Sequence, residues 1–381
     1  MIVMACYAVE DSLKRISVVV LVALAAVISC GTSAKQPASA GASRSQAGRP
    51  ELSQGVTEFK GGLSAISADS GTDVWATGEF AILHWNGKKW SAVPDPVPGT
   101  AGGLKAVKAF SKANVWIAGI GKTGAFIVHW NGSKWTRIST PALANTDDLS
   151  GIVGSSPASV WAVGMNADGS APAILHWNGK TWSRVKASLP RGANGGYLNS
   201  VAVLSPTDAW AAGAYETPGA SHTLVLHWNG VKWSPVASPS PGTDAYLNSV
   251  SASPAGIWAA GVGGSDGADA LALRWNGKAW TKVAIANPAE VYLYAVTALS
   301  PTSAWAIGDY SDSSFLNPDR PLTMHWNGKV WSRAANPAPR STHLVAMTVI
   351  SRTSIWVAGQ KGPGIFNPVG VLLHWNGKAW S

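Results

Sequence analysis

The amino-acid sequence predicts an all-β protein, a seven-bladed β-propeller with four antiparallel strands in each blade. The motif His-Trp-Asn-Gly-x-x-Trp, first found at residues 84–90, occurs seven times at intervals of 45 to 51 residues, once with Arg274 in place of the histidine. Each interval has room for four short strands and shows no 3.6-residue apolar period of a helix. The chain has 21 tryptophans, and they divide into three per repeat.

Each repeat contains four segments. The first is Leu-x-x-Val, as at residues 198–201, and these segments place the starts of the repeats near residues 63, 104, 149, 198, 247, 293 and 344. The second is an apolar segment that ends in Gly, three residues after a tryptophan; the seven members are Trp75, Trp116, Trp161, Trp210, Trp258, Trp305 and Trp356. One blade cannot bury both of its faces, so we expect these tryptophans to pack between neighbouring blades.

The third and fourth segments are the arms of a hairpin. Asn-Gly between apolar runs is typical of a two-residue type I′ turn, in which both central residues have positive φ. A turn at Asn86-Gly87 places Trp85 opposite Lys88 and Leu83 opposite Trp90. Because side chains alternate along a strand, Leu83, Trp85 and Trp90 are then expected on one face.

The first part of the chain is not expected to join the fold. A basic pair, Lys14-Arg15, precedes an apolar run that ends at Val27-Ile28-Ser29-Cys30 and resembles a bacterial lipobox. We interpret residues 1–30 as a signal peptide whose Cys30 becomes lipidated, residues 31–54 as a flexible tether, and residues 55–381 as the propeller. This predicts a protein anchored by lipid to the outer face of a bacterial membrane; an ordinary secretory signal with a chance cysteine is the alternative.

The repeated segments also carry a family resemblance. Leu-x-x-Val, Trp-Ala-Val-Gly at residues 161–164 and Leu-x-His-Trp-Asn-Gly-x-x-Trp resemble bacterial propellers of the sialidase-like (Asp-box) and photosystem II stability-factor-like repeat class, in the WD-repeat/BNR-like superfamily. The resemblance implies that the first segment is the innermost strand. It does not extend to activity, because Trp85 or Trp177 stands where an Asp-box has Asp, and the arginine cluster of catalytic sialidases is not recognisable.

The loops predict which end of the ring binds a ligand. The loops between second and third segments and between repeats vary in length, and these loops share one end of the ring. All tyrosines of the mature chain lie there, together with Phe315, and they form the candidate ligand-binding set: Tyr197, Tyr215, Tyr246, Tyr292, Tyr294, Tyr310 and Phe315. Aromatic rings at a channel mouth can stack on a sugar or a peptide, whereas plain packing of the blades is the alternative.

The opposite end is expected to be basic. The chain has a net charge of +9, and lysines follow every Asn-Gly turn: Lys88, Lys89, Lys134, Lys180, Lys232, Lys278, Lys329 and Lys378. These lysines either keep exposed turns soluble or face anionic lipid headgroups or wall polymers. Nucleic acid is excluded as a partner, because the predicted compartment is wrong and no aromatic residues are interleaved with the lysines.

No catalytic, metal-binding or cofactor-binding residue is assigned. The six hairpin histidines lie in separate blades and cannot converge on one metal ion, so we expect them to be hydrogen-bonded structural residues. His222 and His343 are expected at the surface. Calcium binding by Asp309, Asp312 and Asp319 lacks a repeated ligand pattern. Glu216 with Asp266 or Asp269 remains a candidate acid/base pair whose separation the sequence does not give.

Two function classes remain open. The sequence favours a monomeric, non-catalytic binding or assembly module with a glycan or protein ligand. The alternative is a cell-surface glycan hydrolase or lyase that uses carboxylates of the variable loops.

Ring closure is expected to involve the segment before the first repeat. The sequence ends one residue after Trp380, so the last outer strand is short, and Val56–Phe59 is expected to pair with the seventh blade. The alternative is that the chain is truncated and residues 51–60 belong to the tether.

Overall fold

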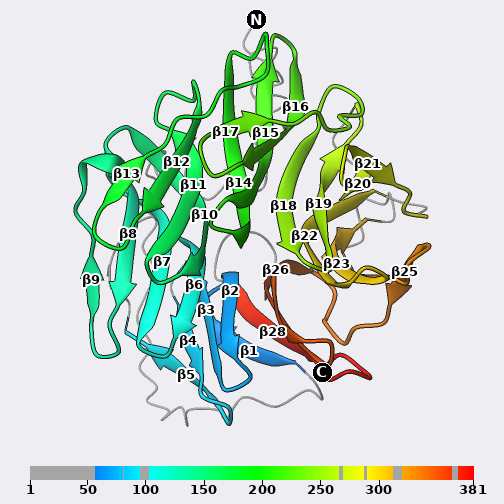
Figure 1. Ribbon diagram of the computed structural model, residues 1–381. Helices are drawn as coiled ribbons and strands as arrows, with labels where there is room; N and C mark the ends of the chain where they lie inside the picture. The colour runs from blue at the N-terminus through cyan, green and yellow to red at the C-terminus, as the bar shows by residue number, and fades with distance from the viewer. Residues whose placement is uncertain are drawn as a thin grey trace, which may run out of the picture. The chain divides into compact units, whose positions relative to one another are not determined.

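The computed structural model describes residues 56–79, 81–94, 103–265, 269–286, 290–311, 320–362 and 368–381, all within one compact unit, Ser53–Ser381. These residues form seven antiparallel sheets of four strands each, arranged in a ring (Figure 1), which confirms the predicted β-propeller. The predicted lipidation site Cys30 lies outside the described residues. The described part of the chain contains no helix with the length and apolar character needed to span a membrane.

The sheets, or blades, follow one another in chain order. Blades 1 to 3 are β2 (Leu63–Ser70), β3 (Asp73–Gly78), β4 (Ile82–Trp85), β5 (Trp90–Val93); β6 (Leu104–Ser111), β7 (Asn114–Gly121), β8 (Gly124–Trp130), β9 (Trp135–Arg137); and β10 (Thr146–Ser156), β11 (Ser159–Asn166), β12 (Pro172–Trp177), β13 (Trp182–Arg184). Blades 4 and 5 are β14 (Gly195–Ser205), β15 (Asp208–Thr217), β16 (Ala220–Trp228), β17 (Trp233–Pro235); and β18 (Tyr246–Ser253), β19 (Gly256–Gly263), β20 (Asp269–Trp275), β21 (Trp280–Val283). Blades 6 and 7 are β22 (Val291–Ser300), β23 (Ser303–Tyr310), β24 (Arg320–Trp326), β25 (Trp331–Ala334); and β26 (Thr342–Ser351), β27 (Ser354–Lys361), β28 (Val369–Trp375), β1 (Thr57–Lys60). A short 3-10 helix, η1 (Pro141–Leu143), precedes blade 3.

The first strand of every blade lies at the axis of the ring. These strands contact one another in a closed cycle, β2, β6, β10, β14, β18, β22, β26 and back to β2. Each is an edge strand of its own sheet, so its outer groups need partners from elsewhere. Hydroxyl groups of the preceding blade supply some of these partners. Each accepts a hydrogen bond from a backbone N–H in the first strand of the following blade, and the four residues are Ser67, Ser200, Ser249 and Thr348.

Each first strand carries a β-bulge directly after its leucine. In blade 4, Leu198 pairs with Gly213 but Ser200 pairs with Ala212, so Asn199 is the extra residue, and the same shift occurs in the other six blades. The opposing glycines are required by this geometry. A Cβ atom on them would lie only 1.7 to 2.2 Å from the carbonyl oxygen of the residue before the leucine, at Gly78, Gly119, Gly164, Gly213, Gly261, Gly308 and Gly359.

The hairpin pairing differs from the predicted one. Trp85 pairs with Trp90, not with Lys88, and Leu83 pairs with Ala92, not with Trp90, so the loop has four residues. Only Gly87 has positive φ, and the Asn86 side-chain oxygen accepts hydrogen bonds from the N–H groups of Lys88 and Lys89 at 3.0 Å. The asparagine caps a longer loop, as in all seven hairpins, rather than occupying the left-handed region of a type I′ turn.

The predicted face of the hairpin is nevertheless correct. Leu83, Trp85 and Trp90 belong to one apolar cluster, because partners directly across a pair of strands share a face.

Tryptophans join the blades, as predicted. The second-strand tryptophans are buried, and each meets the fourth-segment tryptophan of the next blade edge to face, with ring centroids 5.2 to 6.1 Å apart: Trp75–Trp135, Trp116–Trp182, Trp161–Trp233, Trp210–Trp280, Trp258–Trp331, Trp305–Trp380 and Trp356–Trp90. Edge-to-face aromatic pairs add about 0.5–1.5 kcal/mol each to the free energy of area burial. The core is therefore divided among seven similar interfaces between blades.

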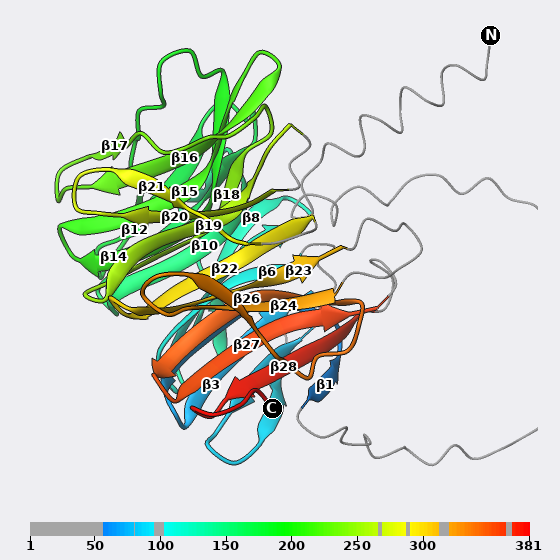
Figure 2. The same cartoon turned by 90° about the vertical axis from the view of Figure 1, so that its right-hand side faces the viewer.

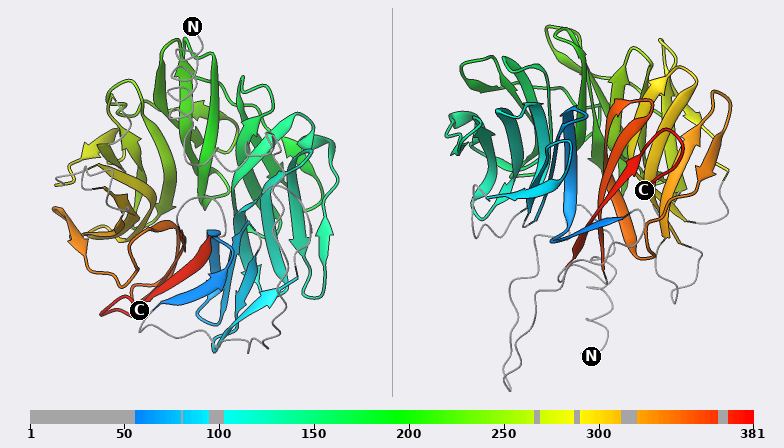
Figure 3. Two further views of the ribbon diagram at one scale, coloured as in Figure 1. Left: turned by 180° about the vertical axis from the view of Figure 1, so that it is seen from behind. Right: turned by 90° about the horizontal axis from the view of Figure 1, so that it is seen from below.

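The N-terminal segment closes the ring, which confirms the expected pairing. β1 pairs antiparallel with β28, with Thr57 opposite Leu372 and Lys60 opposite Val369, and Figure 3 shows the two strands side by side. Trp380 forms an isolated bridge with Trp375, next to the position of β1 on the same edge. Val56 is buried in the cluster that includes Trp305 and Trp380.

The strands run lengthwise between two distinct ends of the ring (Figure 2). At the hairpin end, the Asn-Gly loops pack on the turns between first and second strands; a Cβ atom on Gly87, for example, would touch Thr72 at 2.7 Å. Trp85 Nε1 donates to the carbonyl of Gly71 in the same turn. At the loop end lie the connections between second and third strands and between blades.

Candidate binding site at the axis of the ring

Seven equivalent residues lie at or near the start of the first strands, at the loop end, each directly before the constant leucine. We call them the rim residues: Gly62, Gly103, Asp148, Tyr197, Tyr246, Tyr292 and His343. Blades 1 and 2 present only backbone at the rim, and blades 4 to 6 present three tyrosines in succession. The rim is therefore asymmetric although the blades repeat.

Tyr197 lies in an acidic and aromatic neighbourhood. Burial raises the pKa of its phenol, and the charge of Glu216 raises it further, followed by Tyr246 and Asp244. The phenol remains protonated at neutral pH, so its hydroxyl can donate a hydrogen bond. Glu216 accepts a hydrogen bond from Ser221 Oγ at 3.0 Å.

Asp148 forms an ion pair between blades 2 and 3. Lys105 Nζ lies 2.6 Å from Asp148 Oδ2, and Ser150 Oγ donates to the same oxygen at 3.2 Å. Both charged side chains are largely shielded from solvent, so the pair is screened less than a surface ion pair. Lys105 is the bulge residue of its blade.

On the other side of the ring, Asp309 is buried and connects blades 6 and 7. His343 Nδ1 forms a hydrogen bond with Asp309 Oδ2, and Tyr294 Oη donates to Asp309 Oδ1 at 3.4 Å. The carboxylate accepts, so Nδ1 of His343 carries the proton in this contact. Asp309 is only 2% exposed, whereas His343 is half-buried.

The bulge residues form a second layer beneath the rim. Asn199 Nδ2 donates to the carbonyl of Leu247 and Asn248 Nδ2 to that of Leu293, both at 2.9 Å, and Ser64 Oγ donates to Leu104 at 2.7 Å. Each bond reaches the free edge of the next first strand. The bulges thus turn side chains toward the axis and hold the polar lining in place.

The structure separates the predicted aromatic set into three groups. Tyr197, Tyr246 and Tyr292 are rim residues, and Tyr294 is the bulge residue below them. Tyr215 and Tyr310 lie at equivalent positions on second strands, away from the first strands. The seventh member, Phe315, lies outside the described residues.

Tyr215 and Tyr310 are engaged by their own blades. The ring of Tyr215 stacks on His222 with centroids 5.0 Å apart, and Arg333 Cζ lies 3.8 Å from the ring centroid of Tyr310. Burial alone would raise the pKa of the Tyr310 phenol, but hydrogen bonds from Arg333 and Arg320 outweigh it and lower the pKa.

The carboxylates proposed from the sequence as an acid/base pair or as calcium ligands do not come together in the described part of the structure. Asp269 is exposed at the start of β20, whereas Glu216 pairs with Gly195 in blade 4, and Asp266 lies outside the described residues. Asp312 and Asp319 are likewise not described. Within the described ranges, no three His, Cys, Asp or Glu side chains gather in a way that could hold a metal ion.

The hairpin histidines are structural, as expected. Each packs against the second-strand tryptophan of its blade, with ring centroids 4.2 to 4.8 Å apart, and bonds to the residue two positions before that tryptophan, as His84 does with Asp73 at 2.7 Å. Blade 5 has Gly256 at that position and no partner side chain. There Arg274 covers Trp258 instead, with Cζ 5.4 Å from the ring centroid, and donates to the carbonyl of Pro301.

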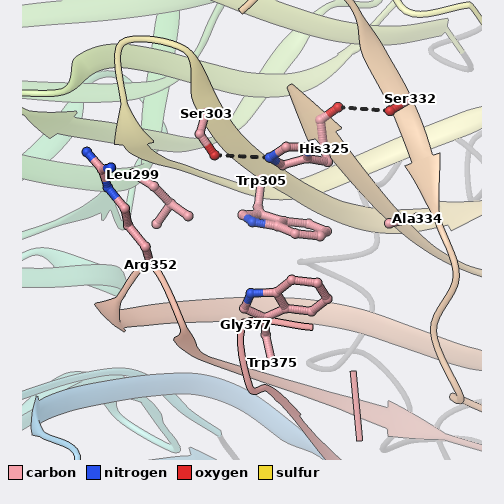
Figure 4. Close-up of a pocket in the computed structure, with 9 residues that line it drawn as sticks. All are labelled: Leu299, Ser303, Trp305, His325, Ser332, Ala334, Arg352, Trp375 and Gly377. Carbon is pink, nitrogen blue, oxygen red and sulfur yellow. Dashed lines mark hydrogen bonds between the residues drawn. The ribbon is translucent and has the colours of Figure 1, made fainter. Parts of the chain in front are cut away.

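A groove at the hairpin end separates the outer parts of blades 6 and 7. It has a volume of about 320 Å³, and Figure 4 shows the indoles of Trp305 and Trp375 within it. Ser303 bonds to His325, and Ser332 donates to the His325 carbonyl, so these polar groups of blade 6 are already hydrogen-bonded to one another. Arg352 stands at its edge. The groove lies at the end opposite the rim.

Sequence reasoning missed Asp148 and Lys105 and treated His343 as an ordinary surface residue. Asp148 and His343 could have been found from their position, because each stands directly before one of the constant leucines. The residue at that position varies among the repeats, whereas the leucine does not. The bulge residues were not identifiable in this way, because their direction depends on a register shift that the sequence does not display.

Comparisons with known proteins agree on the fold. No protein-family model matches the chain, and no curated protein matches it. The solved structure described as YCF48 bound to D1 peptide has a TM-score of 0.56 and 13% identity, and the match covers 84% of this chain and 97% of that one. The Niastella koreensis GH74 enzyme has a TM-score of 0.58 and 14% identity, and the match covers 86% of this chain and 55% of the enzyme. At such identities, the similarity shows that this chain shares their β-propeller fold.

Proposed function

We propose that this protein is a non-catalytic binding or assembly module that holds an extended peptide segment of a partner protein at the rim. The observation that carries the proposal is the asymmetric rim, with tyrosines in three successive blades and glycines in blades 1 and 2. Tyrosine offers a large apolar face and a hydroxyl with little conformational entropy to lose. Gly62 and Gly103 are buried and add no side chain to the rim, so the tyrosines of blades 4 to 6 supply most of its aromatic surface.

The polar groups of the rim suit a peptide backbone. The Tyr197 hydroxyl is a protonated donor, and Asp148 in blade 3 and His343 in blade 7 flank the three tyrosines, each with a fixed partner. Fixed side chains lose little freedom on binding, which favours recognition of a defined segment. The similarity in fold to a propeller described with a bound peptide supports this choice of ligand class.

A glycan hydrolase is the second candidate. Glu216 and Asp244 both act on the Tyr197 phenol, so two carboxylates lie near one rim residue, and the fold is also that of a GH74 enzyme. Against this, Asp148 and Asp309 are already held by Lys105 and His343. A retaining or inverting hydrolase needs two carboxyl groups about 5 to 9.5 Å apart with a sugar between them.

We further propose that the module is held at the outer face of a bacterial membrane by lipid on Cys30. The lipobox-like residues 27–30 and the Ser-, Ala- and Gly-rich segment after them support this. Replacing Cys30 with Ala is expected to release the protein from the membrane fraction or leave it unprocessed. Unchanged mass and unchanged detergent partitioning would contradict the anchor.

Peptide and glycan arrays, probed side by side with the full chain, test the binding proposal. We expect retention on peptides, and we expect Tyr246→Ala and Tyr292→Ala each to weaken it about 10- to 30-fold, as for aromatic interface anchors. Leu204→Ala, at the opposite end of the ring, is the matched control and should bind as the parent does. Retention on glycans alone would overturn the peptide assignment.

Release of reducing ends from polysaccharides distinguishes the second candidate. A binding module releases no reducing ends, so the parent and Glu216→Gln are expected to give the same background signal. Turnover that disappears in Glu216→Gln while the protein remains folded would establish the hydrolase instead.

A further inference from the structure

The two ends of the ring differ in charge. Exposed cations crowd the hairpin loops and the turns beside them: Lys88, Lys89, Lys112, Lys134, Lys180, Lys232, Lys278, Lys329, Lys378 and Arg352. The described acidic residues at this end are Asp69, Asp73 and Asp208, and the last two are bonded to His84 and His227. Carboxylates concentrate at the other end, among them Asp148, Glu216, Asp244 and Asp309. The hairpin end is therefore a cationic face.

Exposed apolar side chains lie on this same face. The large hydrophobic residues exposed in the described part of the chain are Val231 at 81%, Val330 at 56% and Leu204 at 36%. Val231 and Val330 belong to the hairpin loops of blades 4 and 6, and Leu204 precedes the turn of blade 4 that packs under one of these loops. Apolar side chains beside cations distinguish this surface from a face that only maintains solubility.

The loops that carry these residues are rigid by construction. In every hairpin the asparagine side chain accepts hydrogen bonds from two backbone N–H groups of the loop, as Asn229 does from Val231 and Lys232 at 3.0 Å. The third and fourth loop positions, which hold the lysines and the two valines, are thus presented in one conformation around the ring. A preorganised ring of this kind can contact a flat surface at several points with little ordering cost.

We propose that the hairpin end docks on an anionic phospholipid bilayer. Lysines and Arg352 contact headgroup phosphates, and Val231, Val330 and Leu204 enter the interface. A lysine near an anionic bilayer contributes about 1 kcal/mol, and a shallowly inserted apolar side chain adds part of its burial free energy. A soluble polyanion would bind the lysines but would not bury the valines. The exposed apolar residues therefore favour a bilayer as the partner.

The docking has a consequence for the rim. The hairpin end and the loop end are opposite ends of the same strands, so a ring lying on its hairpin loops presents the rim away from the membrane. This inference does not rest on the proposed binding function, and it does not depend on lipidation of Cys30.

The test is co-sedimentation of the full chain with vesicles of phosphatidylcholine alone or mixed with phosphatidylglycerol. We expect a preference for the mixed vesicles that declines with salt. Lys180→Gln/Lys232→Gln should weaken binding to mixed vesicles about 30-fold, from about 1 kcal/mol per lysine. Residues 1–55 are common to all variants, so their own affinity cancels in the comparison.

Two further variants make the assignment specific. Lys60→Gln/Lys122→Gln removes the same charge from exposed lysines at the loop end and should bind as the parent does. Val231→Ser/Val330→Ser should weaken binding about tenfold, because part of two side chains no longer leaves water. All substituted side chains are exposed, so folding is expected to persist and is checked by the thermal midpoint.

Two outcomes would overturn the proposal. Equal losses in the hairpin-end and loop-end lysine variants would mean that net charge alone matters. Unchanged binding by the valine variant, with capture of inorganic polyphosphate that depends on Lys180 and Lys232, would assign the face to a soluble polyanion.

Discussion

The carbonyl oxygen of Tyr197 lies so close to Gly213 that a Cβ atom on the glycine would come within 2.0 Å of it. The contact fixes the bulge of β14 and thereby the position of the rim residue. Because the obstructing atom is backbone, a side chain here must move the first strand. We expect Gly213→Ala to lower the free energy of unfolding by about 3 kcal/mol, the upper part of the range for overpacking.

Urea denaturation followed by tryptophan fluorescence measures this change. Gly71→Ala is the control, since a Cβ atom there meets no atom within 4 Å. Equal midpoints for the two variants would show that the bulge does not constrain the strand.

The tryptophans between blades predict a second stability change. Trp161 is 3% exposed and contacts Trp228 and Trp233 of the next blade at 5.0 and 5.3 Å. Trp161→Ala is expected to cost about 3–5 kcal/mol, as for other buried large aromatic residues. Val231→Ala, in an exposed hairpin loop, should leave the urea midpoint at the parent's value. A parental midpoint for Trp161→Ala would contradict the packing.

The hairpin histidines predict a dependence of stability on pH. Burial lowers the pKa of His129, His176, His325 and His374 from the usual 6.5. The unfolded chain therefore binds more protons than the folded chain once pH falls below that value. The free energy of unfolding is therefore at its full value above about pH 6.5. It decreases as the pH falls through the lowered histidine pKa values of the folded protein.

Urea midpoints at about pH 7.5 and about pH 5.5 compare a pH above the usual histidine pKa with one below it, where the decrease has begun. His129→Gln removes one of the four groups and should make the decrease smaller. A midpoint that rises on acidification, or an undiminished decrease in this variant, would exclude the histidines as its cause.

The closing strand predicts slow hydrogen exchange near the start of the ring. Thr57–Lys60 pairs with β28, Lys361 Nζ lies 3.1 Å from Glu58 Oε1, and Phe59 contacts Trp90 edge to face. We expect protected amides in Thr57–Lys60 and faster exchange in Phe59→Ala, which loses the contact with blade 1. Exchange as fast as in residues 31–50 would rule out the pairing in solution.

The repeats made the architecture predictable, because seven copies of one pattern specify strands, turns and inter-blade tryptophans together. The hairpin register was wrong for a local reason. Asn86 satisfies two loop N–H groups with its side chain, and this competes with the two-residue turn that Asn-Gly otherwise favours. The replacement of the hairpin histidine by Arg274 was visible in the sequence. Its relation to Gly256, which removes the side chain that would bond to a histidine, is visible only once the paired strands are known.

The candidate site was only partly predictable. Tyr197, Tyr246 and Tyr292 are found by their position before the constant leucines. Lys105 and Tyr294 reach their partners Asp148 and Asp309 through a bulge, and a bulge is set by packing across the strands. Each of these contacts between blades occurs once in the ring, so it does not recur from repeat to repeat and cannot be recognised in the sequence.

The pairing of β1 with β28 determines an order of assembly during synthesis. A ribosome makes Thr57–Lys60 before any blade, yet the partner of this segment is among the last strands to emerge. Blades 1 to 6 can form in succession while β1 waits as an unpaired strand, exposed to pairing with other nascent chains. Its charged residues Glu58 and Lys60 disfavour such pairing, as charges do on exposed edge strands. The first segment of the propeller to be translated is thus the one that completes it.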